Sequence, residues 1–474
     1  MHSLLPEILK FFSLLLAAYF IVGNGTYTLL MLLSLVSVWL HSWRFHDEGL
    51  EQWRESPVTP PVTIIMPAWN EQDIIVESVR SILQTDYPGM QVCVVDDGST
   101  DATLERLIAA FQLVPSSLIS RSRLATRPLR AFYGSRENPK LLIISKENGG
   151  KPDALNAGLN MCRTPYFCTL DSDCILERDA LLRLMRPVIR SSQQIAASGG
   201  IVRVLNGCTV SNGAVVKVDL PPSALERFQV VEYLRSFLFG RTGWDLLGGT
   251  LVVSGAFAAF HRETVIEAGG FSTDTVTEDM ELVVRLRRWA DCHRRRIRTS
   301  FTSEPVCWSQ CPRSLNMLAR QRRRWQLGLC QTLWKNSKML FNPAFGAIGL
   351  FSFPFHVFVE AAGALVEPAG YLVIPLAAFY DPSLLRFLLP FLLLSLAYAG
   401  FLSFGAVVLE ELTHRRYPDA HHLALLFLYA LLENFGYRQL VLWYRLQGVV
   451  RFLTGPHNWE KVVHVAAHDE QAAS

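Results

Sequence analysis

Apolar residues are concentrated at the two ends of the chain, and a region of mixed pattern lies between them. The first apolar stretch covers residues 11–40 and is nearly free of charge. A helix rises ~1.5 Å per residue and the hydrocarbon core of a bilayer is ~30 Å thick, so the stretch is long enough for one tilted crossing. A hairpin turning at residues 23–25 is disfavoured, because it would need two unusually short helices. A secretory signal peptide fits poorly, since the stretch is too long and lacks a clear cleavage site.

The second apolar region begins near residue 345 and contains three stretches. Residues 347–379 include prolines and glutamates, and predict either a kinked hairpin or an interfacial helix followed by one crossing. Residues 384–409 and 423–443 are cleaner and predict two further spans. Arg44 and Arg54, which follow the first stretch, favour a cytosolic location for the middle of the chain.

The middle of the chain alternates short apolar runs with segments of helical periodicity. The runs at 62–66, 92–95, 141–144 and 166–170 are partly β-branched, and each ends in a polar or glycine-rich loop. This alternation predicts a mainly parallel α/β sheet whose ligands bind at the carboxyl ends of the strands. The irregular, basic stretch 113–140 is expected to be a surface insertion.

These patterns predict an N-terminal transmembrane segment at 1–45, an α/β domain at 46–340, interfacial and transmembrane helices at 341–445 and a tail at 446–474. The composition agrees with an apolar part joined to a soluble domain. Half of the 474 residues are hydrophobic and 18% are charged, against ~25% charged in an average soluble protein. The formal net charge of +3 and the lack of basic runs interleaved with aromatics argue against nucleic acid as a partner. The nine scattered cysteines, without a CxxC pair, favour reduced thiols.

Two acidic motifs directly follow apolar runs. Asp96 and Asp97 come after residues 92–95, where a carboxylate suits a uracil N–H or a ribose hydroxyl, but capping of the next helix explains the motif equally well. Asp171 and Asp173 flank one residue after 166–170. Carboxylates with this spacing can bind one hard divalent ion, which would bridge a diphosphate and neutralise its charge as it leaves.

Three further motifs lie at or on expected helices. Gly149, Gly150 and Lys151 place flexible backbone and an ammonium group at a helix start, which suits a phosphate or an ordinary exposed loop. Glu278 and Asp279 precede a helical run, where a carboxylate can cap the helix or take a proton from an acceptor hydroxyl.

A basic segment, residues 321–325, lies on a helix before the second apolar region. A basic face that contacts anionic lipid is one interpretation, and we expect it for Arg322 and Arg323. In the other interpretation Arg324 faces a diphosphate and Trp325 stacks on a sugar.

Taken together and in this order, the motifs resemble family 2 glycosyltransferases with transmembrane helices, which include cellulose, chitin, hyaluronan and poly-N-acetylglucosamine synthases. The resemblance covers roughly residues 60–330. It identifies a nucleotide-binding loop, a uridine-binding acidic motif, a Gly-Lys motif, a DxD metal motif, a TED base and a QxxRW motif. The matching residues are, in that order, Pro67, Ala68, Asn70 and Glu71; Asp96 and Asp97; Lys151; Asp171 and Asp173; Glu278 and Asp279; and Gln321, Arg324 and Trp325.

The resemblance implies a GT-A-like α/β domain with a Rossmann-like mixed sheet, a UDP-sugar donor, Mg²⁺ or Mn²⁺, and inversion at the anomeric carbon with Asp279 as the base. Asp171 would contact the nucleotide as well as the metal. The QxxRW motif is typical of members that extend polysaccharides, so we expect a processive synthase with coupled export, in the bacterial inner membrane and with a cytosolic catalytic domain. Accessory export subunits are not identified by the sequence.

Two alternatives remain open: transfer of one sugar to a membrane lipid, and a catalytically silent scaffold or receptor. The sequence also suggests a cytosolic tail in which Trp459 and Lys461 form either a gate over the nucleotide or an interfacial anchor. Arg445 and Arg451 favour a cytosolic location for this tail, against Arg415 and Arg416 at the other end of the span predicted at 423–443.

Overall fold

The computed structural model describes residues 4–45, 50–54, 56–118, 122–417 and 419–455. The chain divides into two compact units. We call them the helical unit, whose described residues lie within 4–42, 219–249 and 311–455, and the sheet unit, whose described residues lie within 43–218 and 250–310. α11 (Leu315–Lys335), which the sequence assigned to the α/β domain at 46–340, clusters with the helical unit.

The sheet unit is built on one mixed sheet. Within the described residues its strand order is β3-β4-β5-β2-β1-β6-β11-β8-β12-β7. A separate hairpin pairs β9 with β10. The strands are β1 (Val62–Ala68), β2 (Met90–Asp96), β3 (Leu113–Pro115), β4 (Leu129–Ser135), β5 (Leu141–Lys146), β6 (Tyr166–Leu170), β7 (Ile175–Leu176), β8 (Gln194–Val204), β9 (Thr209–Ser211), β10 (Ala214–Lys217), β11 (Phe257–His261) and β12 (Ile297–Ser309).

The centre of the sheet is parallel, and its edges are largely antiparallel. β5, β2, β1 and β6 run in the same direction, whereas β11 is antiparallel to β6 and to β8. The four apolar runs of the sequence are thus the four central parallel strands. Their carboxyl ends lie at one edge, where the polar motifs follow them.

Helices cover the sheet and complete its core. They are α2 (Glu51–Arg54), α3 (Ile75–Leu83), α4 (Thr103–Phe111), α5 (Lys151–Met161), α6 (Ala180–Arg190), α9 (Arg262–Glu267) and α10 (Glu278–Cys292). Apolar residues of α5, α9 and α10 form one continuous core with the central strands. In that core a Cβ on Gly158 would lie 2.4 Å from Ile65, so only glycine lets α5 pack this closely on β1.

The predicted surface insertion at 113–140 is partly regular structure. Residues 113–115 and 129–135 form β3 and β4, and β4 pairs with β5 in antiparallel orientation. These strands were not predicted because β4, which lies next to the edge strand β3, is only partly buried and therefore lacks a strong apolar pattern.

The helical unit consists of long apolar helices and shorter connecting ones. They are α1 (Leu4–Phe45), α7 (Ala224–Tyr233), η1 (Leu234–Arg241), α8 (Thr242–Leu246), α11, η2 (Ser337–Met339), η3 (Pro343–Phe345), η4 (Ile348–Ser352), α12 (Phe353–Phe355), η5 (His356–Ala361), α13 (Ala362–Tyr380), η6 (Pro382–Leu384), α14 (Leu385–Thr413), α15 (Ala420–Leu432) and α16 (Tyr437–Thr454).

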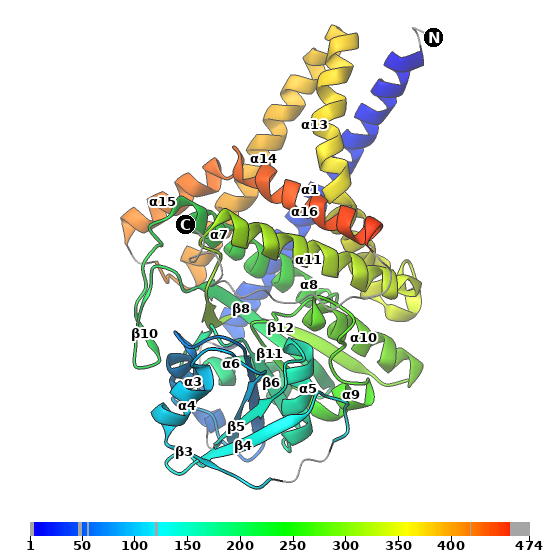
Figure 1. Ribbon diagram of the computed structural model, residues 1–474. Helices are drawn as coiled ribbons and strands as arrows, with labels where there is room; N and C mark the ends of the chain where they lie inside the picture. The colour runs from blue at the N-terminus through cyan, green and yellow to red at the C-terminus, as the bar shows by residue number, and fades with distance from the viewer. Residues whose placement is uncertain (1–3, 46–49, 55, 119–121, 418, 456–474) are drawn as a thin grey trace. The chain divides into compact units, whose positions relative to one another are not determined.

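Three helical stretches in the described part of the chain are long and apolar enough to cross a bilayer. They are Glu7–Leu40, Ile348–Tyr380 and Leu389–Thr413. In Figure 1 the first lies in the blue helix α1 and the third in the orange helix α14, and the second runs through η4, α12 and η5 into the yellow helix α13. α1 continues through residues 23–25 without a break, so the hairpin alternative is excluded. The segment from Ile348 to Tyr380 is helical throughout and is likewise not a hairpin.

The span predicted at residues 423–443 is wrong. The structure has two helices there, α15 and α16, separated at Gly436, whose φ of 107° favours glycine. α15 has 13 residues, which at ~1.5 Å each do not cover a ~30 Å hydrocarbon core. Buried Glu433 and Asn434 follow it directly. Because residues 423–443 are not one crossing, residues 413–422 and the tail are not its two ends. The positive charges of these two segments therefore no longer indicate the orientation of the tail.

Charged side chains inside the helical unit pair with one another. Glu360 in η5 accepts from Tyr27 Oη of α1 at 2.5 Å and pairs with Arg445 of α16 at 3.3 Å. Arg445 also donates to Gln326 of α11 at 2.9 Å. One ionic group therefore connects four helices that are far apart in the sequence.

Candidate active site

Loops at the carboxyl ends of the central strands carry most of the predicted site residues. Pro67 and Ala68 end β1 and are buried, while Asn70 and Glu71 follow in the loop. Asn70 has a φ of 57°, and its side-chain oxygen accepts from Thr100 N at 2.8 Å. This hydrogen bond joins the loop after β1 to the loop after β2, as expected if both loops contact the same ligand.

Asp96 shapes the end of β2. Its carboxylate accepts from Ser99 N at 3.1 Å and from the Ser145 hydroxyl at 3.1 Å, and the residue is buried. These contacts hold the turn after β2, but they do not cap the next helix α4, which begins at Thr103.

Asp97 makes an extensive set of internal contacts. It pairs with Lys146 Nζ at 2.6 Å, and its two oxygens accept from Gly149 N at 3.0 Å and Gly150 N at 2.7 Å. Burial raises the pKa of Asp97, although Lys146 and the two N–H groups act in the opposite direction. The amides of Gly149 and Gly150, which suited a phosphate in one interpretation of the sequence, both donate to Asp97 in the structure.

Lys151 connects two of the predicted acidic motifs. It begins α5 after Gly150, whose φ is 86°. Its Nζ lies 2.6 Å from Asp171 Oδ1 and 3.1 Å from Glu278 Oε1. Burial by itself would lower the pKa of Lys151, but the two carboxylates outweigh it and raise that pKa above its usual range, so the side chain is cationic.

Asp173 and Glu71 show an excess of negative charge around the DxD motif. Burial, with added repulsion from Asp171, raises the pKa of Asp173 to about 6. Burial and then repulsion from Asp173 raise the pKa of Glu71 to about 7. A hard divalent cation would relieve this repulsion, so the residues fit Mg²⁺ or Mn²⁺. The described part of the chain has no group of three His, Cys, Asp or Glu side chains arranged around one ion, so Asp171 and Asp173 would need further ligands from substrate or water.

Glu278 and Asp279 stand in the first turn of α10, as predicted. A Cβ on Gly255 would lie 2.7 Å from Asp279 Oδ2, so the loop before β11 passes directly against this carboxylate. The carbonyl of Gly255 also accepts from Lys151 Nζ at 3.4 Å. Lys151, Asp171, Glu278 and Asp279 therefore form one cluster.

Gln321, Arg324 and Trp325 lie on α11 in the helical unit. Arg324 is exposed and Trp325 is 40% exposed. Arg322 was expected to face lipid, and this is wrong: it is buried, pairs with Glu232 at 2.8 Å and lies 4.3 Å from the Trp325 ring centre. Burial of an arginine on a helix is possible here because a carboxylate neutralises it. Trp459 and Lys461 lie outside the described residues.

Sequence reasoning missed Lys146, Asp153 and Gly255. Lys146 is fully buried and pairs with Asp153 at 2.7 Å as well as with Asp97. The available signal was a lysine ending an apolar strand, at a position where period-two alternation places it on the same face as Ile144. Gly255 had no comparable signal.

Two family models match the chain. The model described as glycosyl transferase family 2 matches residues 63–265, and the model described as glycosyl transferase family group 2 matches residues 166–432, more than half of the chain. Both models include the DxD motif.

Curated relatives agree with the family models. The chain is 25% identical over 268 residues to a poly-beta-1,6-N-acetyl-D-glucosamine synthase of Staphylococcus aureus, covering 56% of this chain and 54% of the relative. It is 22% identical over 282 residues to the synthase of the same name from Staphylococcus epidermidis, covering 58% and 57%. The chain thus spans about half the length of the curated relatives it matches.

A solved mannosyltransferase from Pyrobaculum calidifontis, in complex with GDP-Man and Mn²⁺, matches 93% of this chain and 99% of its own, at 20% identity and a TM-score of 0.49. The mixed sheet and the family models confirm the GT-A-like fold flanked by apolar helices. With a family model covering more than half of its length, the chain belongs to the family 2 glycosyltransferases.

Proposed function

We propose that the protein transfers a sugar from a UDP-sugar to a growing polysaccharide at a membrane, with inversion at the anomeric carbon. The observation that carries the proposal is the contact of Lys151 with both Asp171 and Glu278. It unites the Gly-Lys, DxD and TED motifs in one cluster, as a single transfer reaction requires. The proposed location is the bacterial inner membrane, with the sheet unit in the cytosol.

In this proposal Asp279 is the general base. It takes the proton of the acceptor hydroxyl while the acceptor oxygen bonds to the anomeric carbon. The bond between that carbon and the diphosphate oxygen breaks in line, and UDP leaves with the electron pair. Lys151 binds the diphosphate and stabilises the charge that develops on it. Mg²⁺ or Mn²⁺, held by Asp171 and Asp173, would supply further neutralisation of the leaving group.

The remaining site residues act on the reactants directly or through the loops that they hold. The loop of Pro67, Ala68, Asn70 and Glu71 lies on the nucleotide side, and Asp96 and Asp97 hold the loops beside it. Gln321, Arg324 and Trp325 bind donor and acceptor. The relatives named as polysaccharide synthases support a polymer product, and the three long apolar helices support a membrane location. Export of the product is part of the proposal.

The test is incubation of the purified protein with a panel of UDP-sugars, with UDP release and product size as readouts. We expect UDP release with one sugar and a ladder or polymer as product. A single glycolipid would replace the polymerase assignment with transfer of one sugar to a lipid. Release of no nucleotide with any donor and acceptor pair would contradict the proposal.

A further inference from the structure

The end of β5 carries a lysine that has no contact with solvent. Lys146 Nζ lies 2.6 Å from Asp97 Oδ1 and 2.7 Å from Asp153 Oδ1, and it donates to the Glu147 carbonyl at 2.6 Å. Asp97 directly follows β2, and Asp153 lies in the first turn of α5. A buried charge is retained only with partners at close range, so Lys146 fixes the start of α5 relative to the end of β2.

The Asp97 carboxylate also holds the loop between Lys146 and Lys151. Gly149 N and Gly150 N both donate to Asp97, at 3.0 and 2.7 Å. A Cβ on Gly98 would lie 2.9 Å from Asn148 N, so this loop is pressed against the loop after β2. Three successive residues before Lys151 are therefore held by contacts to the segment at Asp97 and Gly98.

Asp97 points into the protein. Its side chain is 4% exposed, and both oxygens accept from groups of the chain itself. Direct contact with a uracil ring is the role implied by family resemblance, yet the contacts in this chain run to the loop that leads to Lys151.

We infer that Lys146 and Asp97 are positioning residues, which hold the Gly149–Gly150 loop and thereby place Lys151 against the diphosphate of the donor. The inference rests on the proposed nucleoside diphosphate-sugar donor. If Lys146 and Asp97 act through Lys151, their loss weakens binding of the second phosphate of the nucleotide. If they contact the base, their loss weakens binding of the nucleoside. The two roles are separable by comparing a nucleoside monophosphate with the diphosphate.

The experiment measures the dissociation constants of UMP and UDP by calorimetry, using the full chain in detergent with Mn²⁺. The variants are Lys146→Met, Lys151→Met and the double variant. Loss of a charge-assisted hydrogen bond to the diphosphate predicts a ~10- to 100-fold weaker binding of UDP in Lys146→Met. UMP binding should change less than ~2-fold, and the double variant should bind UDP like Lys151→Met alone, since residues that act through one another are not additive.

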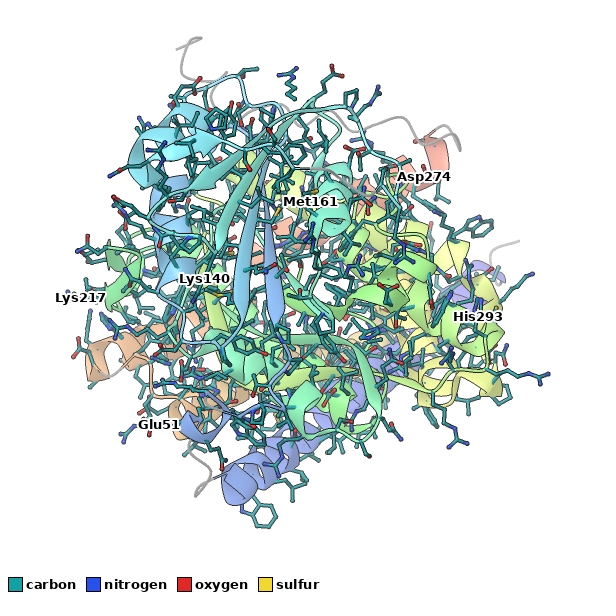
Figure 2. The ribbon with its side chains drawn as sticks, turned by 90° about the horizontal axis from the view of Figure 1, so that it is seen from below. Glu51, Lys140, Met161, Lys217, Asp274 and His293 are labelled. Carbon is teal, nitrogen blue, oxygen red and sulfur yellow. The ribbon has the colours of Figure 1, made fainter. Side chains whose placement is uncertain are left out.

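The matched control is Lys140→Met, at the residue directly before β5. Lys140 is exposed and is labelled in Figure 2, so both affinities should equal those of the wild type. If Lys146→Met does not fold, Asp153→Asn replaces it, because this change leaves the Lys146–Asp97 pair intact. We expect it to weaken UDP binding ~3- to 10-fold, the effect of one hydrogen bond, again without an added effect of Lys151→Met.

Equal losses for UMP and UDP would overturn the inference in favour of contact with the base. Additive effects of the two lysine variants, or unchanged UDP binding in a folded variant, would overturn it as well. An error in the proposed donor is distinguishable, because the wild type would then bind another nucleoside diphosphate, and its mono- and diphosphate pair would serve for the same comparison.

Discussion

Gly255 lies so close to Asp279 that one added methyl group tests the assignment of Asp279 as the base. An alanine Cβ at this position would lie 2.7 Å from Asp279 Oδ2 and 3.1 Å from its Cγ, whereas ordinary contacts begin at 3.4 Å. In the Gly255→Ala variant the Asp279 carboxylate must therefore move by about 0.7 Å. A misplacement of this order can reduce the rate of an aligned reaction by up to ~100-fold. We therefore expect the kcat of Gly255→Ala to be about 10- to 100-fold lower than that of the wild type.

Stability and nucleotide binding should be nearly unchanged in Gly255→Ala. The displaced atoms belong to a side chain, and the loss of freedom in the unfolded chain stabilises by ~0.4–1 kcal/mol, which offsets part of the strain. The assay is steady-state UDP release, with thermal unfolding and UDP affinity measured on the same samples. Gly134→Ala is the matched control, because a Cβ there has no neighbour within 4 Å.

Two results would refute this reasoning. A wild-type kcat in Gly255→Ala would mean that Asp279 tolerates displacement and is not an aligned base. A loss of UDP affinity in Gly255→Ala as large as its loss of kcat would mean that the methyl group acts on the nucleotide site and not through Asp279.

Three further outcomes follow from the same cluster. Asp171→Asn or Asp173→Asn should lower turnover at least ~100-fold, and EDTA should do the same to the wild type, because the ion supplies several kcal/mol; full activity in EDTA would contradict the metal assignment. Asp279→Asn should keep UDP affinity and abolish transfer, in a binding assay run beside the activity assay; lost affinity with normal turnover would reverse this role. The pKa values of Glu71 and Asp173 are raised to about 7 and about 6 in the folded protein, so thermal unfolding should show that the metal-free protein loses stability as pH rises through 6–7. Calorimetry should show that Mn²⁺ binds more tightly as pH rises over the same range, and that binding releases protons. A Mn²⁺ affinity that does not depend on pH would contradict this prediction.

The parts of the fold that were predictable from sequence share a strong local signal. The four central strands are buried on both faces, so they read as continuous apolar runs, and the carboxylates and glycines after them stand out against that background. Lys151 and Glu278 were likewise predicted at helix starts, where the structure has them. The roles of these residues in catalysis stay predictions.

The remainder depended on long-range pairing. Arg322 reads as a surface charge until Glu232, 90 residues away in the chain, is known to neutralise it. The stretch at 423–443 reads as one span because its hydropathy does not reveal that Glu433 is matched by Arg438 at 2.7 Å. Lys146 follows the same rule, since a buried lysine is recognised only by the carboxylates that meet it in space.

The ionic group of Tyr27, Glu360 and Arg445 has a consequence for the order in which the protein is made. Synthesis proceeds from the N-terminus, so the helical stretch Ile348–Tyr380 is complete well before Arg445 is added. Until then Glu360 has Tyr27 of α1 as its hydrogen-bond donor and lacks its cation. An isolated charge within an apolar helix disfavours insertion by ~2.5–3.5 kcal/mol at the bilayer centre. Chains truncated before α16 should therefore be retained by the insertion machinery or degraded. Membrane assembly of the helical unit would then be complete only once α16 is made.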